Sequence, residues 1–252
     1  MGIVNVTPDS FSDGGDTVAP EDAIALGLRQ IADGADIIDV GGESTRPGAR
    51  PVSPDEEVLR VLPVVTALAK AGAVVSIDTR HTAVMAAAID AGARIVNDVS
   101  ALEGPGSLAF AAAGTADIVL MHMPGTPQTM RANAQYAEVV DEVYAYLARR
   151  IAACEAAGIV RERIAVDPGF GFGKMADHNE RLLAGLARFK DLGCPVLVGL
   201  SRKFGKGKAP KERLAESLEK ARDAVMRGAD ILRVHDVAET VEMLGKIASK
   251  KT

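Results

Sequence analysis

The sequence predicts an α/β protein, and within that class a single (β/α)8 barrel, also called a TIM barrel, with an eight-stranded parallel core over residues 1–252. Three observations predict this fold. Eight short apolar runs alternate with stretches of helical spacing. The length of 252 residues suits one closed barrel, whereas an open doubly wound sheet usually has fewer strands. No linker or low-complexity segment divides the chain.

The predicted strands are rich in Val, Ile and Leu and show little alternation with polar residues. Strands covered on both faces need this composition, and alternation with helices favours parallel pairing through right-handed crossovers. In chain order the strands are residues 1–7, 36–40, 74–79, 94–100, 117–123, 164–169, 195–201 and 231–236.

The predicted helices lie between these strands, where apolar residues recur at a period near 3.6. Three of them end in near-copies of one segment, in which Gly34, Gly92 and Gly228 can take the left-handed conformation that stops a helix. This repetition indicates a repeated βα unit. The helices are residues 21–32, 54–69, 82–91, 139–157, 179–189, 211–227 and 237–248.

Composition excludes several classes of partner. The 29 basic and 34 acidic residues give a net charge of −5, which offers no global basis for binding nucleic acid or a membrane surface. Cys154 and Cys194 are too few for a disulfide framework. No apolar run approaches the roughly 20 residues of a membrane span, and the N-terminus lacks the pattern of a signal peptide. We therefore expect a cytoplasmic protein.

Polar residues gather at the ends of the predicted strands. In a (β/α)8 barrel these carboxyl ends form the active-site face. Turn and cap chemistry would explain one or two such positions, but not a ring of them. The ring comprises Asn5, Thr7, Asp39, Glu43, Ser44, Thr45, Arg46, Asp78, Asn97, Asp98, His122, Asp167, Ser201, Arg202, Lys203, Arg233, His235 and Asp236.

Three chemical classes can be separated within this ring. Carboxylate and amide groups on strands suit the amide and amino edges of a flat heterocycle, and these are Asp78, Asn97 and Asp167. Groups that are cationic, or can become so, suit an anion such as phosphate, and these are Arg46, Lys203, Arg233 and His235. Asn5, with Asp39, Thr45 or Asp78 nearby, could help to hold Mg²⁺, which takes few protein ligands.

The glycine-rich run at residues 169–174 has the sequence GFGFGK. It is not a Walker phosphate loop, because Pro168 and Met175 occupy positions that require Gly and Ser or Thr. Two interpretations remain open, a tight turn and a ligand-covering loop that carries Phe172.

Seven motifs, in order along essentially the whole chain, resemble those of dihydropteroate synthase. The first two are highly specific, whereas a short motif such as SRK is weak by itself. They are MGIVNVTPDSFSDGG (1–15), DVGGESTRPG (39–48), SIDT (76–79), NDV (97–99), DPGFGFGK (167–174), SRK (201–203) and RVHDV (233–237).

The resemblance implies a transferase of folate biosynthesis. Such an enzyme condenses 6-hydroxymethyl-7,8-dihydropterin diphosphate with 4-aminobenzoate, giving 7,8-dihydropteroate and pyrophosphate, with Mg²⁺ assisting diphosphate departure. Sulfonamides inhibit it by mimicking the aminobenzoate.

The resemblance also implies roles for individual residues. Asp78, Asp167, Lys203 and Arg46 form the catalytic set. Asp78, Asn97, Asp167 and Lys203 bind the pterin. Asn5, Thr45, Arg46, Arg233 and His235 bind the diphosphate, and Asn5 is the Mg²⁺ ligand. Pro47, Phe172, Ser201 and Lys203 form the aminobenzoate pocket.

The sequence departs from the family pattern after Lys203. The loop at 204–210 is short, and Phe204 stands where the family often has a small residue. The following helix region is highly charged, although in the family it contributes to a homodimer interface. Two alternatives therefore stay open beside the synthase, namely a catalytically impaired or engineered pterin-binding barrel and a pterin-dependent methyltransferase relative.

Overall fold

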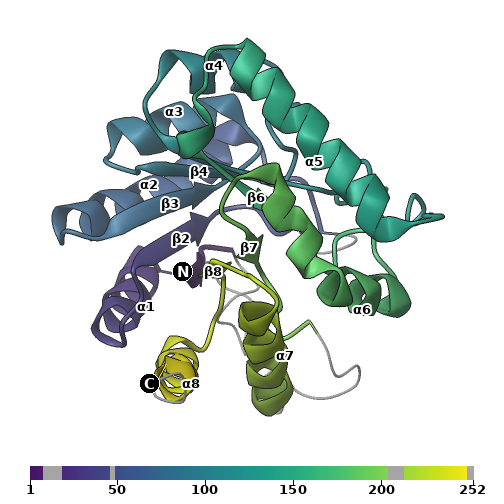
Figure 1. Ribbon diagram of the computed structural model, residues 1–252. Coiled ribbons are helices and arrows are strands. Elements are labelled where there is room, and N and C mark those ends of the chain that lie inside the picture. The colour runs from purple at the N-terminus through teal and green to yellow at the C-terminus, as the bar shows by residue number, and fades with distance from the viewer. Residues whose placement is uncertain (8–18, 46–48, 204–212, 249–252) are drawn as a thin grey trace.

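The computed structural model describes residues 1–7, 19–45, 49–203 and 213–248. Strands occupy the centre and helices surround them (Figure 1). The strands are β1 (Gly2–Asn5), β2 (Ile37–Gly41), β3 (Val74–Asp78), β4 (Ile95–Asp98), β5 (Asp117–Met121), β6 (Ile164–Asp167), β7 (Leu197–Val198) and β8 (Ile231–Leu232).

The strands pair in chain order, and all of the pairs are parallel. β1 to β6 form one sheet, and β7 with β8 forms another. Isolated parallel bridges join the two sheets at both junctions, Gly2 to Val234 and Val166 to Val196. Backbone hydrogen bonds support each junction, from Ile3 N to Val234 O at 2.9 Å and from Val166 N to Pro195 O at 2.9 Å. The predicted eight-stranded parallel barrel is confirmed.

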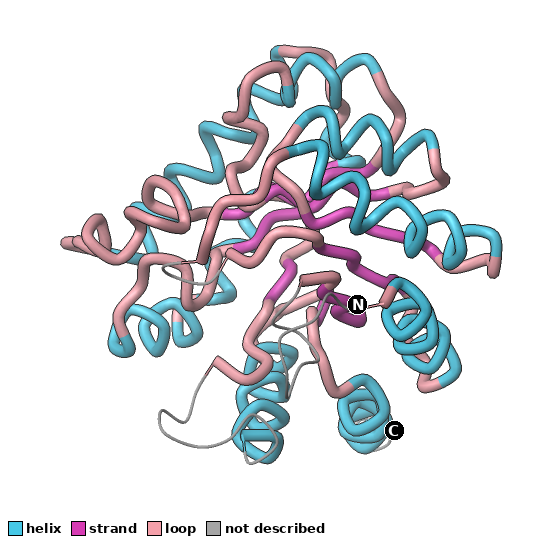
Figure 2. The backbone as a smooth tube through the Cα atoms, turned by 180° about the vertical axis from the view of Figure 1, so that it is seen from behind, coloured by secondary structure: helices cyan, strands magenta, loops and turns pink. Residues whose placement is uncertain are grey.

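Helices surround the strands on every side (Figure 2). They are α1 (Pro20–Ala32), α2 (Pro54–Lys70), α3 (Thr82–Asp90), α4 (Ser107–Ala113), α5 (Val139–Ala156), α6 (Ala176–Ala184), α7 (Leu214–Met226) and α8 (Val237–Ala248), with 3-10 turns η1 (Arg161–Arg163) and η2 (Leu186–Leu192). In the described part of the chain, no helix is long and apolar enough to cross a membrane.

Several elements differ from the sequence prediction. β7 and β8 span two residues each instead of the predicted residues 195–201 and 231–236, and η1 was not predicted. The sequence prediction lacks helix α4. This helix has only seven residues, most of them alanine, which is too short for a helical period to be detected. The segment predicted as one helix over 179–189 is instead α6 followed by η2. Leu186, Phe189 and Leu192 are all buried, and their spacing of three matches the 3-10 period.

The barrel interior is filled at its amino-terminal end. Ile95, Val119 and Leu197 pack there as a buried cluster of their own. Partly buried residues at the starts of other strands, including Met1 and Ile231, complete the layer. Because this apolar plug closes the lower end, the polar strand ends face the other opening, which we call the barrel mouth.

We predict that Leu68→Ala lowers the free energy of unfolding by about 2–5 kcal/mol, because it leaves a cavity in the layer between α2 and α1. Leu68 is fully buried, whereas Leu59 on the same helix is 76% exposed. Leu59→Ala is therefore the matched control and should change stability by less than about 0.5 kcal/mol. Urea denaturation measures both variants, and equal losses would contradict this packing.

Candidate functional site

Three predicted site residues lie at one level of the barrel mouth. In the strand register Asn5 pairs with Gly41, Gly41 with Asp78, and Asp78 with Asn97. Gly41 lies directly beside Asp78, since a Cβ there would lie 3.4 Å from the Cβ of Asp78. Four adjacent strands thus place an amide, a gap, a carboxylate and a second amide side by side.

Arg233, just after β8, joins two carboxylates across the mouth. Its Nε donates to Asp39 Oδ2 and its NH2 group donates to Asp78 Oδ2, both at 2.6 Å. Asn97 Nδ2 donates to the same Asp39 oxygen at 3.0 Å. The Asp39 side chain is fully buried, and that of Arg233 is only 16% exposed. This network connects β2, β3, β4 and the end of β8.

The charges of this network perturb one another. Burial raises the pKa of Asp78 to about 7, Arg233 opposes the rise, and the carboxylate of Asp39 adds to it. Burial alone would lower the pKa of Arg233, but Asp39 and Asp78 outweigh burial and raise it. Arg233 is therefore a permanent cation, whereas Asp78 exchanges its proton near neutral pH.

A second pair of opposite charges lies on the other side of the mouth. Burial raises the pKa of Asp167 at the end of β6, and Lys203 opposes that rise. Withdrawal from water lowers the pKa of Lys203 to about 8, and Asp167 opposes that shift. Lys203 Nζ donates to Phe170 O at 2.6 Å and lies 4.6 Å from the centre of the Phe172 ring. The structure thus brings Asp167, Lys203 and Phe172 together.

The turn at Ser201 and Arg202 presents Lys203 to the mouth. Arg202 has a left-handed φ of 60°, which is rare for a residue other than glycine. Two contacts hold it there, an ion pair with Asp236 and a bond from its backbone N–H to Ser217 Oγ at 2.9 Å. These contacts stabilise the strained backbone of Arg202, and strained residues of this kind are common at functional sites.

His235 contacts this turn through Ser201. Ser201 Oγ lies 3.0 Å from His235 Nδ1, and the backbone N–H of His235 donates to Ser201 Oγ at 3.3 Å. Burial lowers the pKa of His235 to about 3, with further lowering by Arg202 and Arg233. At neutral pH the ring is therefore uncharged, so His235 offers a neutral hydrogen-bonding group at the mouth.

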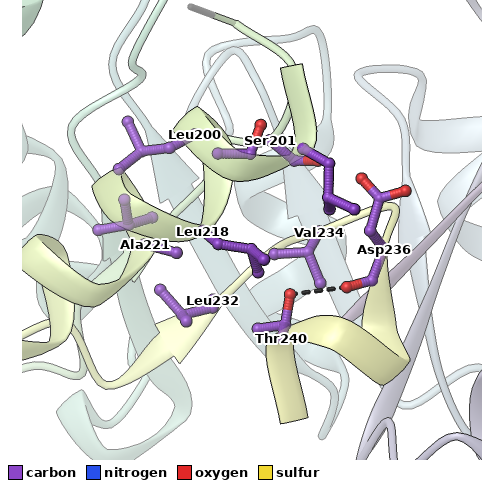
Figure 3. Close-up of a pocket in the computed structure, with 11 residues that line it drawn as sticks. Leu200, Ser201, Leu218, Ala221, Leu232, Val234, Asp236 and Thr240 are labelled. Carbon is purple, nitrogen blue, oxygen red and sulfur yellow. Dashed lines mark hydrogen bonds between the residues drawn. The ribbon is translucent and has the colours of Figure 1, made fainter. Parts of the chain in front are cut away.

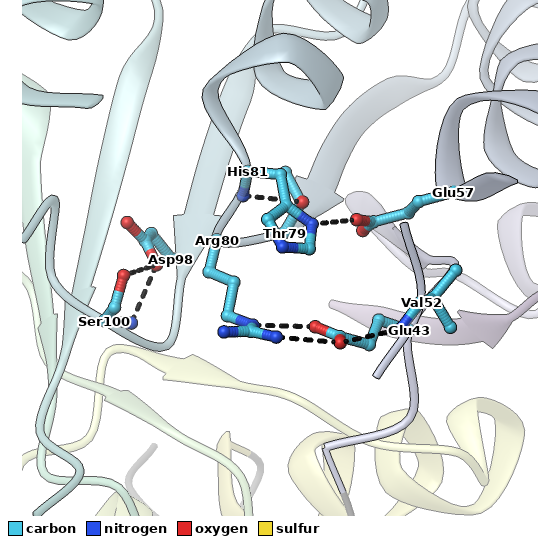
Figure 4. Close-up of polar contacts among 8 residues, drawn as sticks. All are labelled: Glu43, Val52, Glu57, Thr79, Arg80, His81, Asp98 and Ser100. Atoms are coloured by element: carbon cyan, nitrogen blue, oxygen red, sulfur yellow. Dashed lines mark hydrogen bonds and ion pairs between the residues drawn. The ribbon is translucent and has the colours of Figure 1, made fainter. Parts of the chain in front are cut away.

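A polar network fixes the segment after β2 (Figure 4). Arg80 donates to both carboxylate oxygens of Glu43, at 2.8 and 2.9 Å, and Val52 N donates to Glu43 at 3.2 Å. His81 Nδ1 lies 2.7 Å from the buried Glu57. Thr45 follows Glu43 by two residues in the sequence and is half-buried. Arg46, Pro47 and the short loop at 204–210 lie outside the described residues.

A small cavity of about 10 Å³ lies behind the mouth, between α7, α8 and the ends of β7 and β8 (Figure 3). Ser201, Val234 and Asp236 are among the residues that line it. It has room for about one water molecule, so it is too small for a heterocyclic ligand.

Asn5 is the predicted metal ligand, and its surroundings fit a weakly held Mg²⁺. Among the described residues, no group of three His, Cys, Asp or Glu side chains could hold a metal ion. Mg²⁺ is often held by one or two protein oxygens together with substrate phosphates and water. The half-buried Asn5 amide, level with Asp78, offers one such oxygen.

Two residues, Asp39 and Lys174, make contacts in the structure that the sequence pattern did not indicate. Asp39 holds Arg233, although the sequence indicated it only as one neighbour of a metal. Lys174, whose side chain is buried, contacts His122 and the backbone of Phe172. The signal for Asp39 was an acidic residue inside an apolar strand, which requires a buried partner.

Comparisons with known proteins agree with this arrangement. A family model described as pterin binding enzyme matches residues 1–235. A dihydropteroate synthase of Escherichia coli K12 is 50% identical over 249 residues, which cover 97% of this chain and 88% of the relative.

Two solved structures are also similar over nearly their whole length. One is the dihydropteroate synthase of Xanthomonas albilineans with 4-aminobenzoic acid, at a TM-score of 0.94 and 48% identity, covering 100% of this chain and 92% of the other. The same organism's enzyme in complex with 7,8-dihydropteroate gives a TM-score of 0.90 and 45% identity over the same shares of the two chains.

We predict that Arg233→Gln raises the pKa of Asp78 above its value of about 7. The substitution removes the cation that opposes protonation and leaves the repulsion from Asp39 unbalanced, so both changes favour the protonated acid. Carbon-13 NMR titration of labelled aspartate carboxyl groups measures the shift. Arg202→Gln is the control, because Arg202 pairs with Asp236. An unchanged or lower pKa in Arg233→Gln would contradict this assignment.

Proposed function

The chain belongs to the dihydropteroate synthases among the pterin-binding enzymes, and from this premise we propose how its own residues carry out the reaction. It is a transferase that condenses 6-hydroxymethyl-7,8-dihydropterin diphosphate with 4-aminobenzoate to give 7,8-dihydropteroate and pyrophosphate. The likeness to synthases over nearly the whole chain favours this function over that of a methyltransferase relative or an inactive pterin-binding barrel.

One observation carries the mechanistic proposal, namely that two buried carboxylates of the mouth are each opposed by a cation. Asp78 pairs with Arg233, and the charges of Asp167 and Lys203 offset each other. With Asn97 between them on β4, these groups offer both donors and acceptors to the edges of a pterin. In this proposal Asp78, Asn97, Asp167 and Lys203 hold the ring.

The carboxylates have a further role as the C–O bond to the diphosphate breaks. The bonding electron pair leaves with the diphosphate, and the methylene carbon shares its positive charge with the pterin ring. Asp78 and Asp167, fixed beside that ring, stabilise the developing cation. The amine of 4-aminobenzoate then forms the new C–N bond and releases one proton. Because the arylamine is already a neutral nucleophile, the site needs chiefly to position it.

The departing diphosphate is bound from the side of β8. Arg233 uses two of its N–H groups on Asp39 and Asp78, so three remain for an anion. His235 is neutral, and Ser201 can donate to its Nδ1, which leaves the Nε2 proton for a diphosphate oxygen. Asn5, Thr45 and Arg46 complete the proposed set, and Arg46 also helps to exclude water that would capture the cation.

The aminobenzoate is proposed to lie against Phe172, beside Lys203 and Ser201, with Pro47 on the other side. The exposed part of Lys203 and the half-buried ring of Phe172 border the mouth. Lys203 would thus contact both substrates, which suits a residue at the junction between them.

Mg²⁺ is the proposed cofactor, held by Asn5 and by the diphosphate. When bound, it would neutralise negative charge that develops on the leaving group. Arg233 would share this task through its own charge, and the neutral His235 would add a hydrogen bond to the diphosphate.

Two broader proposals concern the setting of the enzyme. A cytoplasmic location is supported by Cys154 and Cys194, which are buried as free thiols. A homodimer is supported by the family resemblance and by exposed apolar residues on the α7 and α8 side, Met226 and Val241.

We predict that Asp78→Asn and Asp167→Asn each lower the rate of pyrophosphate release at saturating substrates by about 10²–10³-fold, because each removes a charge fixed beside the developing cation. Measuring pyrophosphate release with and without 4-aminobenzoate distinguishes departure of the diphosphate from formation of the C–N bond. The control is Asp117→Asn, which alters an exposed residue at the opposite end of the barrel and should retain the wild-type rate. Full activity in either active-site variant would contradict the mechanism.

We also predict that chelation of divalent cations slows pyrophosphate release, and that Asn5→Ala raises the Mg²⁺ concentration needed for half-maximal rate by about tenfold. Loss of one protein oxygen weakens a site that has few others. A Mg²⁺ titration of wild-type and variant enzyme measures the change. An identical Mg²⁺ dependence would exclude Asn5 as a ligand.

A further inference from the structure

Lys174 is a buried lysine to which the proposed mechanism gives no role, and burial lowers the pKa of its amino group to about 7. It ends the loop at 169–174, and only 8% of the residue is exposed. A lysine is seldom buried to this extent unless several acceptors surround its ammonium group. The contacts of Lys174 therefore indicate what the buried amino group does.

Three acceptors from two loops surround Lys174 Nζ. It donates to His122 O at 3.1 Å and to Phe172 O at 3.0 Å, and it lies 3.0 Å from His122 Nδ1. Burial, with Lys174 adding to its effect, lowers the pKa of His122 to about 3. The imidazole is thus neutral and, facing an ammonium group, accepts at Nδ1. Lys174 joins the loop after β5 to the loop after β6.

The loop needs such donors because its backbone is irregular. Gly169, Gly171 and Gly173 have positive φ angles of 72°, 79° and 57°, so the loop cannot satisfy its carbonyls through helix or sheet pairing. Side chains from outside the loop or at its end donate to three of its backbone carbonyls. Lys203 donates to Phe170 O, Lys174 to Phe172 O, and the hydroxyl of Tyr136 to Gly173 O at 3.1 Å.

The loop also packs directly on the backbone of His122. A Cβ added at Gly169 would lie 2.0 Å from His122 O and 3.1 Å from Lys174 Nζ. The ammonium group therefore lies within the contact between the two loops. If the amino group were lost, the partly buried Phe172 O would lose its donor, next to the ring that faces Lys203.

We propose that Lys174 is a positioning residue for the aminobenzoate pocket, because it anchors the Phe172 backbone to His122 and thereby sets the place of the Phe172 ring. Lys174 itself contacts neither substrate. This inference rests on the proposed function, in which Phe172 forms one wall of that pocket. On this proposal, the hydrogen bonds of a buried lysine amino group determine how 4-aminobenzoate is held.

The test compares steady-state constants of Lys174→Met with those of the wild-type chain. We expect the KM for 4-aminobenzoate to rise about tenfold, while the KM for the pterin diphosphate stays within about twofold, because the pterin groups lie on strands. A merely structural role would lower the fraction of active enzyme and leave both KM values unchanged. Lys190→Met is the matched control, since Lys190 forms an exposed ion pair with Asp230.

A second variant keeps the test decisive. Lys174→Gln removes the charge but retains a donor, so we expect a rise of about threefold in the same KM, and this variant decides alone if Lys174→Met does not fold. An unchanged KM for 4-aminobenzoate in the folded variants overturns the inference. Failure of the wild-type chain to release pyrophosphate in an aminobenzoate-dependent reaction would instead overturn the proposed function, so the two failures are distinguishable.

Discussion

The barrel mouth depends on one interaction, the contact of the Arg233 guanidinium with Asp39 and Asp78. Both carboxylates lie on neighbouring strands, and without a cation between them their repulsion and desolvation would be severe. Arg233 reaches them because the chain closes into a barrel that brings the residue after β8 beside β2 and β3. The charge balance of the site therefore depends on closure of the barrel.

This balance is incomplete, and its incompleteness suits the reaction. Asp78 keeps a pKa of about 7 beside a permanent cation, and Lys203 has a pKa of about 8. Both groups would be unambiguously charged in water. A site whose carboxylates are not fully compensated gains when positive charge forms on a bound ring, so part of its unfavourable electrostatic energy is relieved in the transition state.

Much of this could be predicted from the sequence, because strand and helix periods and polar strand ends depend on local order. The eight strands, and the placement of Asp78, Asn97 and Asp167 at the mouth, follow from that order. The contact between Arg233 and Asp39 could not be predicted, because 194 positions separate the two residues in the sequence and only closure of the barrel brings them together. The neutral state of His235 likewise depends on burial and on two arginines brought near by folding. The helix α4 was too short to leave a periodic signal.

The charge state of His235 bears on turnover as well as binding. A second permanent cation beside Arg233 would strengthen contacts with the diphosphate before the bond breaks as well as after it. It would also hold the pyrophosphate product more tightly. Burial, together with Arg202 and Arg233, keeps the imidazole neutral, so it can donate one hydrogen bond without adding charge. In the proposed mechanism, Arg233 as a fixed cation and His235 as a neutral donor would together bind the diphosphate and still allow pyrophosphate to leave.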